Sequence, residues 1–208
     1  MNNPSVVAEN GDQLLEPFCW GLDPLFWTHV KLFASQIYAL ISAPRIEDSH
    51  FLRIGDGPAR PIVRVEVIGT VVRIQPIRIG CVYTLDDGTG FLRCCYFSGQ
   101  VDDEQDLLPW DTIELGVTLQ IRGKLKIEKE MYTERDVLLK GVRGPHRSIV
   151  VESMRVVTNP NEELCASAET INLCRHEYCK EAKTITMHAK QSMEKRLEEE
   201  VQGSDLYS

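Results

Sequence analysis

The sequence predicts a mainly β protein in which five short strands close into a small barrel, with a helix before and a helix after it. Three observations predict this class. Segments rich in valine and isoleucine alternate with polar residues between positions 61 and 157. Glycines interrupt the first and fourth of these segments, at Gly69 and Gly123, where a glycine indicates a bulge or a sharp bend in a strand. Segments with helical spacing of apolar residues flank the strands on both sides.

Composition limits the classes of protein that the chain can belong to. The apolar and charged fractions of its 208 residues are close to those of soluble globular proteins. No apolar run approaches the roughly 18 residues of a membrane span, and the N-terminal segment lacks the basic start and apolar stretch of a secretory signal. We therefore expect an intracellular protein without membrane contact, whose seven cysteines are reduced thiols rather than a disulfide framework.

Charge is distributed unevenly along the chain. The formal net charge of −8 argues against a strong, autonomous nucleic-acid binder, because affinity for the phosphate backbone comes largely from lysine and arginine. Residues 98–116 carry six acids and no cation, whereas residues 122–147 carry eight cations and four acids. The acidic total therefore hides a basic segment.

The segment before the strands predicts a helix. Residues 1–19 are expected to be disordered, and Asp23 followed by Pro24 is a favourable helix start. Apolar residues then recur at helical spacing from Leu22 to Ile41, which predicts an amphipathic helix over residues 23–41. This helix and the barrel are expected to form one domain over residues 20–158.

The strands follow in order, separated by recognisable connections. Residues 61–75 alternate as a first strand, and residues 81–97 form a hairpin around Asp87 and Gly88. The fourth and fifth strands are expected over residues 116–128 and 147–157, joined by a basic loop at residues 129–146. The adjacent acids of the hairpin are interpreted as turn chemistry rather than as a catalytic or metal-binding pair.

The C-terminal segment, residues 159–208, predicts a long helix and a tail. Asn159 can cap the helix and Pro160 suits its first position, and an apolar stripe then continues to Leu197. A helix over residues 160–200 would span about 60 Å, which is further than one small barrel can cover. We therefore expect its second half to dock against a partner.

Five strands of this pattern favour a Greek-key barrel, of which the OB-fold is the commonest five-stranded form. OB-folds bind single strands on the face of their second and third strands and in the loops that join strands one to two and four to five. Tyr96 and Phe97 alternate in direction, so at most one of them faces that groove. The cations and the aromatic residue that occupy these places are the candidate DNA contacts: Arg73, Arg78, Arg93, Phe97, Lys124, Lys126 and Lys140. The alternative is a solvated basic surface without a DNA role.

Several stretches resemble one family when they are taken together and in order. They are "WGLDPLFWTHVKLF", "FLRIGDGPARPIVRVEVIGTVV", "LDDGTGFLRCCYF", "IRGKLK" and "VTNPNEEL", which cover roughly residues 20–165. This pattern resembles the Stn-type subunit of the CST telomere-capping complex. Many relatives carry tryptophan where this chain has Phe97, and the chain lacks the paired winged-helix domain that some relatives carry, so it is either a shorter branch or an N-terminal part.

The resemblance implies a single OB-fold related to the middle subunit of replication protein A. It implies single-stranded telomeric DNA as ligand, and a small Ten-type OB protein and a large CST subunit as partners. It further implies regulation of telomerase and of the fill-in step by DNA polymerase alpha–primase, at telomeres in the nucleus. The resemblance also places a heterodimer interface on the C-terminal helix, for which the apolar stripe offers Leu164, Ile171, Tyr178 and Ile185.

Two other functions fit the same sequence. One is a general single-stranded-DNA-binding protein like the replication protein A middle subunit, and the other is an OB-fold scaffold that binds protein without touching DNA. No P-loop, nucleophile elbow, zinc-protease or dinucleotide motif occurs, so no enzyme, catalytic residue or cofactor is predicted. The cysteines and histidines of residues 165–188 lack the paired spacing of a zinc site, so no metal site is predicted.

Overall fold

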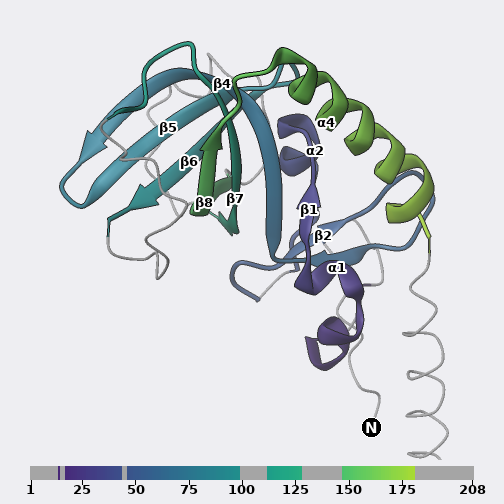
Figure 1. The fold of residues 1–208 in the computed structure, drawn as a ribbon. Coiled ribbons are helices and arrows are strands. Elements are labelled where there is room, and N and C mark those ends of the chain that lie inside the picture. The colour runs from purple at the N-terminus through teal and green to yellow at the C-terminus, as the bar shows by residue number, and fades with distance from the viewer. Residues whose placement is uncertain (1–13, 15–16, 44–45, 99–111, 128–146, 181–208) are drawn as a thin grey trace, which may run out of the picture.

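A closed barrel is the centre of the computed structural model, which describes residues 14, 17–43, 46–98, 112–127 and 147–180 (Figure 1). The sheet order runs β4-β5-β6-β8-β7, and β7 pairs again with β4, so that these five strands close on themselves. The β6–β8 pair is parallel and the other barrel pairs are antiparallel. The predicted five-stranded OB-like barrel is confirmed. Its strands are β4 (Arg64–Ile77), β5 (Gly80–Asp86), β6 (Phe91–Phe97), β7 (Thr118–Ile127) and β8 (Arg147–Val156).

The long strand β4 closes the barrel because its two halves pair with different neighbours. Residues 64–70 pair with β7, and residues 70–77 pair with β5. A side chain at Gly69 would place its Cβ 2.8 Å from the carbonyl oxygen of Asp86, and one at Gly123 would place it 2.1 Å from that of Val150. Close approach of backbones therefore requires both of the glycines that the sequence singled out, and a register shift begins directly before Gly123.

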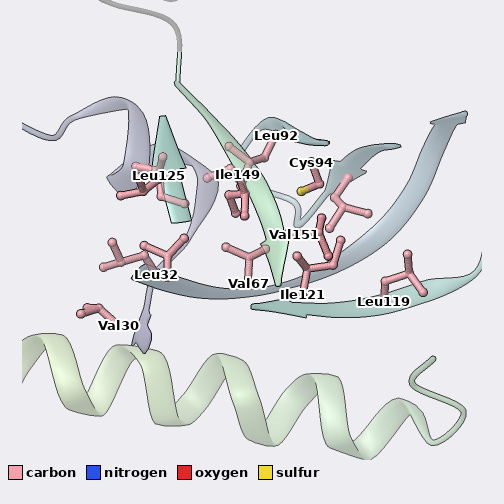
Figure 2. Close-up of a cluster of buried hydrophobic side chains, with 14 of the residues drawn as sticks. Val30, Leu32, Val67, Leu92, Cys94, Leu119, Ile121, Leu125, Ile149 and Val151 are labelled. Carbon is pink, nitrogen blue, oxygen red and sulfur yellow. The ribbon is translucent and has the colours of Figure 1, made fainter. Parts of the chain in front are cut away.

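Alternation along the strands builds the core. Val65 and Val67 point inward and are almost fully buried, whereas the neighbouring Arg64 lies on the outside. Figure 2 shows Ile121, Ile149 and other apolar side chains meeting between the strands. The side-chain period of two in a strand gives each barrel strand one inner and one outer face, and the outer face carries the candidate contacts.

The structure differs from the predicted N-terminal helix over residues 23–41. The segment instead forms η1 (Pro17–Leu22), α1 (Pro24–Trp27), β1 (His29–Lys31) and α2 (Ala34–Tyr38). Asp23 does cap α1, since its carboxylate accepts the N–H of Leu25 at 2.8 Å. The helix ends at Trp27 because β1 pairs in parallel with β4, which buries Val30 opposite Val65. Pairing with the barrel edge thus outweighs helical spacing, and η1 begins within the segment expected to be disordered.

The hairpin between β5 and β6 holds the start of α2. Asp87 accepts the N–H groups of Thr89 and Gly90 within the turn, at 2.9 and 3.1 Å. Its other carboxylate oxygen accepts, at 2.6 Å, the N–H of Ala34, and Ala34 is the first residue of α2. Asp87 therefore acts in the turn, as the sequence predicts, and also satisfies a free N–H at the end of a helix.

The strands β2 (His50–Leu52) and β3 (Arg60–Ile62) form a small antiparallel sheet, and Arg60 of β3 contacts both the start of α1 and the C-terminal helix. Arg60 donates two hydrogen bonds to the fully buried carboxylate of Asp23, at 2.6 and 2.8 Å. The same guanidinium donates to the carbonyl oxygens of Glu177 and Lys180 at 3.3 and 3.4 Å. One buried ion pair thus joins the start of α1 to the end of the C-terminal helix.

The C-terminal helix consists of α4 (Pro160–Leu173) and the π-helical turn η3 (Cys174–Tyr178). Asn159 caps it, as predicted, by accepting the N–H of Asn161 at 3.0 Å. These elements have 14 and 5 residues, hence 19 together, whereas the sequence predicted a helix to residue 200. Residues 181–208 lie outside the described part, as does the basic loop. Within the described ranges, no helix has both the length and the apolar composition needed to cross a membrane.

Candidate nucleic-acid interface

Strand register places two of the predicted contacts in one row across three strands. Arg73 on β4 lies opposite Thr84 on β5, and Thr84 lies opposite Arg93 on β6. The neighbouring residues Tyr83 on β5 and Cys94 on β6 are fully buried, and Ile74 on β4 packs against the core, so Arg73, Thr84 and Arg93 lie on the outer face. Neighbouring strands are about 4.8 Å apart, so the two arginines are roughly 10 Å apart on the outer face.

The next two rows of the same face carry Phe97 and no acid. Gln75, Val82 and Cys95 form one row, and Ile77, Gly80 and Phe97 form the other. Phe97 is partly exposed, whereas Tyr96 is only 7% exposed and belongs to the core. Phe97 is therefore the aromatic residue of this pair that faces outward. We call these three rows on β4, β5 and β6 the outer strip.

Arg73 and Arg78 are the most available cations near the outer strip. Both side chains are exposed, and neither makes an ion pair with a described residue. Arg78 lies in the turn between β4 and β5, at the end of the strip where Gly80 pairs with Phe97. Arg93 is half-buried within the strip. Cations without carboxylate partners are the groups that phosphates can engage at least cost.

Lys126 continues the row of Arg93, whereas Lys124 belongs to another cluster. Lys126 lies opposite Ser148 on β8, and Ser148 lies opposite Arg93 on β6. The ammonium group of Lys124 lies 3.2 Å from Glu152, which also contacts Arg64 at 3.4 Å. The charge of Lys124 is therefore partly balanced within the chain. Lys140 lies outside the described residues.

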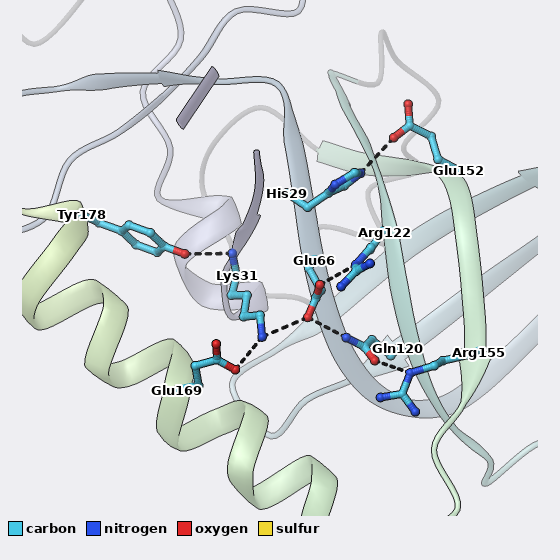
Figure 3. Close-up of polar contacts among 9 residues, drawn as sticks. All are labelled: His29, Lys31, Glu66, Gln120, Arg122, Glu152, Arg155, Glu169 and Tyr178. Carbon is cyan, nitrogen blue, oxygen red and sulfur yellow. Dashed lines mark hydrogen bonds and ion pairs between the residues drawn. The ribbon is translucent and has the colours of Figure 1, made fainter. Parts of the chain in front are cut away.

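The carboxylate of Glu152 stays ionised because of its cationic partners. Burial alone would raise the pKa of Glu152, but hydrogen bonds from His29 and Lys124 and the charge of Arg64 hold that pKa below its usual value. Figure 3 shows His29 of β1 directed at this carboxylate, at 3.1 Å. Lys124 and Arg64 lie directly opposite each other, so Glu152 also screens two like charges.

A second carboxylate, Glu66, fastens α4 and β1 to the barrel. Its side chain is only 6% exposed and accepts from Arg122 and Gln120, both at 2.6 Å (Figure 3). Lys31 lies 3.4 Å from Glu66 and also pairs with Glu169 on α4. Burial would raise the pKa of Glu66, but these donors hold it below its usual value. Sequence reasoning missed this group because its partners meet only through the strand register.

The predicted partner residues on the C-terminal helix separate into two sets. Leu164 and Ile171 are 69% and 42% exposed, so both are available to a partner. Tyr178 is only 5% exposed, and its hydroxyl accepts the N–H of Lys31 at 3.1 Å. Tyr178 lies in the π-helical turn and packs in the core, so its burial argues against the predicted partner contact at this position. Ile185 lies outside the described residues.

Burial raises the pKa of the Tyr178 hydroxyl to about 12, which agrees with its place beside the core. Across the described ranges, no group of three or more histidine, cysteine, aspartate or glutamate side chains could hold a metal ion.

Sequence comparison finds similarity to one kind of protein. No protein-family model matches the chain. It is 28% identical over 139 residues to the CST complex subunit STN1 of Ailuropoda melanoleuca, which covers 57% of this chain and 36% of that protein. The human CST complex subunit STN1 is 27% identical over 139 residues with the same coverage, and the mouse protein is 28% identical over 83 residues. The matched part is about a third or less of the length of these relatives.

Solved structures share the fold. A chain in the crystal structure of the S. pombe Stn1–Ten1 complex superposes with a TM-score of 0.54 at 17% identity, covering 77% of this chain and 99% of that one. A chain of a replication protein A heterotrimer bound to single-stranded DNA gives 0.53 at 19% identity, covering 74% and 99%. A chain from the yeast Stn1 and Ten1 structure gives 0.50 at 14% identity, covering 80% and 84%.

These comparisons agree with the barrel and with the helix that follows it. None of the relatives and structures named above is described as an enzyme. The sequence similarity shows distant homology to CST complex subunit STN1, and the shared fold identifies the chain as an OB-fold protein.

Proposed function

We propose that this protein binds single-stranded DNA through the outer strip of β4, β5 and β6. The observation that carries the proposal is the row of Arg73, Thr84 and Arg93, with Phe97 two rows away and no acid between them. Single-strand-binding OB-folds combine cations that follow the phosphate backbone with aromatic side chains on which bases stack. The outer strip offers both kinds of group on the face that OB-folds use.

The negative net charge of the chain limits the affinity with which the chain alone can bind DNA. With a net charge of −8, the chain alone attracts a polyanion poorly. The basic strip supplies part of a longer positive groove, and the rest of the affinity comes from other subunits of an assembly. We therefore expect weak binding by the isolated chain and tighter binding by the assembled complex.

The assembly we propose is a CST-like complex at telomeres in the nucleus. The chain would pair with a small Ten-type OB protein through its C-terminal helix, join a large CST subunit, and help to regulate telomerase and fill-in by DNA polymerase alpha–primase. Similarity to STN1 and likeness to a chain of the Stn1–Ten1 complex support this role. We expect no catalytic activity and no cofactor.

A second candidate is a general single-stranded-DNA-binding subunit. The likeness to a chain of the DNA-bound replication protein A heterotrimer, with a TM-score of 0.53, favours it. The two functions differ in substrate preference. A telomeric protein keeps telomeric repeat DNA bound when a mixed-sequence competitor is in excess. A general protein instead releases the repeat DNA in proportion to the amount of competitor added. A protein scaffold that uses the OB groove without DNA would show no strand binding at all.

Titration of a labelled single strand with two variants tests the proposal. Phe97→Ala should weaken binding by about tenfold and leave the salt dependence unchanged, because stacking is worth ~1–3 kcal/mol per base and carries no charge. Arg73→Glu should weaken binding and reduce the slope of affinity against salt by about one phosphate contact. Arg53→Glu, an equal charge change on an exposed residue that follows β2, is the matched control.

The titration is best done on the complex with a candidate Ten-type protein, after confirming that each variant keeps the wild-type melting temperature. If Phe97→Ala and Arg73→Glu bind like Arg53→Glu, the outer strip is not the DNA surface. Lys126→Glu should weaken binding more than Lys124→Glu, because Glu152 already engages Lys124.

A further inference from the structure

An open pocket lies on the outer side of β7 and β8, beside the start of α4. Its cavity volume is about 150 Å³, and it is lined by Gln120, Arg122, Ser153, Met154 and Arg155. Arg122 lies opposite Ser153 and Gln120 lies opposite Arg155, so two guanidinium groups from neighbouring strands flank one cavity. None of these residues belongs to the outer strip on β4, β5 and β6.

Both arginines are held in place by acceptors behind or beside them. The Nε of Arg122 donates to the buried carboxylate of Glu66 at 2.6 Å. The Nε of Arg155 donates to the amide oxygen of Gln120 at 2.6 Å, and its Nη1 donates to Glu162 at 2.9 Å. The guanidinium planes are therefore oriented before any ligand arrives, which reduces the entropy lost on binding.

The unused groups of the pocket are almost all donors. Both polar ends of the Gln120 amide are occupied, by Glu66 and by Arg155. Among the described residues, both terminal amino groups of Arg122, one of Arg155 and the hydroxyl of Ser153 have no partner. Figure 3 shows the terminal nitrogens of Arg155 directed away from Gln120. Such a pocket selects a ligand that accepts hydrogen bonds, and guanidinium groups pair best with carboxylate or phosphate.

Acidic residues near the pocket favour a ligand with one anionic group over a polyanion such as nucleic acid. Glu162 and Glu169 on α4 are 41% and 51% exposed beside this surface, and Glu163 follows in the same helix. A nucleic-acid strand would bring its further phosphates against these carboxylates, whereas one oxyanion on an otherwise uncharged ligand would not. The size of the cavity also suits one such group.

We propose that this pocket binds a single oxyanion, a carboxylate or a phosphate group, carried by an otherwise uncharged ligand, for which a peptide with one aspartate or one phosphoserine side chain is a suitable probe. This site is independent of the outer strip, so a failure of DNA binding there leaves it untouched.

Nuclear magnetic resonance on the full chain with labelled arginine tests the site. The probes are inorganic phosphate and four ligands: a glycine–serine-rich peptide with one phosphoserine, the same peptide with one aspartate, the same peptide with alanine, and an oligothymidine strand. We expect the phosphoserine or the aspartate peptide, and inorganic phosphate more weakly, to shift the side-chain signals of Arg122 and Arg155 saturably. The alanine peptide should shift neither signal.

Two kinds of variant separate the site from its structural surroundings. Arg155→Gln should weaken binding of the peptide about tenfold, the loss expected for one charge-assisted hydrogen bond. Ser153→Glu keeps both arginines and their contacts but adds a carboxylate to the pocket, and it should abolish peptide binding. Arg53→Gln, at an exposed residue that follows β2, is the control and should leave peptide binding unchanged.

Preference for phosphoserine or for aspartate tells which oxyanion the pocket selects. Equal shifts with the alanine peptide, no shift with any peptide, or shifts of Arg122 and Arg155 only with oligothymidine would each overturn the proposal. The last result would assign the pocket to nucleic acid.

Discussion

Asp23 shows how one residue can hold together parts of a chain that are distant in sequence. Its carboxylate caps α1 and also accepts two hydrogen bonds from Arg60 in a site from which water is excluded. Arg60 in turn donates to two carbonyl groups at the end of the C-terminal helix. The "WGLDP" segment therefore acts in packing and in fixing where the C-terminal helix ends.

Replacing Asp23 by asparagine separates its two roles. Asparagine retains an oxygen that can cap α1, but the buried Arg60 loses its counter-charge. We expect the free energy of unfolding to fall by about 3–5 kcal/mol, the cost of leaving one charge of a buried pair uncompensated. Removing the exposed cap in Asn159→Ala should cost only about 1 kcal/mol. Urea unfolding measures both, and equal losses in the two variants would contradict the importance of the ion pair.

His50 makes stability depend on pH. It is 2% exposed, and burial together with the charge of Arg147 lowers its pKa from the usual 6.5 to about 4. Between these values the unfolded chain binds the proton more readily than the folded chain, so the free energy of unfolding falls as pH decreases from about 6.5 to about 4.

The contribution of His50 over that interval is roughly 2–3 kcal/mol, given about 1.4 kcal/mol for each unit of pKa. His50→Gln should flatten the curve of unfolding free energy against pH in this window. Parallel curves for wild-type and His50→Gln would contradict this assignment.

The C-terminal helix is held to the barrel by polar contacts and by the buried side chains of Cys174 and Tyr178, while part of its outer side is apolar. Thr170 and Tyr178 face the barrel, whereas Leu164 and Ile171 are exposed. Leu164→Asp with Ile171→Asp should reduce affinity for a Ten-type partner at least tenfold without lowering the melting temperature of the chain alone, because neither side chain is buried in it.

Tyr178→Phe is the contrasting variant for the same helix. It loses the hydrogen bond from Lys31, so it should cost the isolated chain about 1 kcal/mol and leave partner affinity intact. Co-purification and thermal unfolding measure the two effects. A partner that still binds the double aspartate variant at full affinity would show that this face is not the interface.

Elements whose pattern depends on neighbouring residues were predictable, and those that depend on distant pairing were not. Alternation and turn residues indicated β4 to β8, and Asn159 with Pro160 indicated the start of α4. The segment 23–41 has helical spacing, but Val30 is buried by pairing with β4, which no local pattern reports.

The candidate site was predictable to a similar degree. Arg73, Arg93 and Phe97 lie together because the alternation of β4 and β6 fixes which residues point outward. Lys124 differs because its ion pair with Glu152 depends on the register of β7 against β8. A one-residue bulge near Gly123 shifts that register, and the sequence alone does not predict by how many residues the register shifts.

At the scale of the whole molecule, an acidic chain presents a basic and aromatic strip on one face. The acids Glu66 and Glu152 pair with cations on β1, β4 and β7, whereas the rows of the outer strip contain no carboxylate. Under the proposed function, the distribution of charge, rather than its sum, determines where a strand binds.

Photo-crosslinking of a single strand to the assembled complex tests this central claim most directly. A strand in which one thymine at a time is replaced by iodouracil crosslinks to an aromatic side chain on which that base stacks, and mass spectrometry identifies the residue. We predict a crosslink at Phe97 on β6 that is lost in Phe97→Ala. Crosslinks confined to other surfaces of the chain, or unchanged yield in Phe97→Ala, would contradict the assignment of the outer strip as the DNA-binding surface.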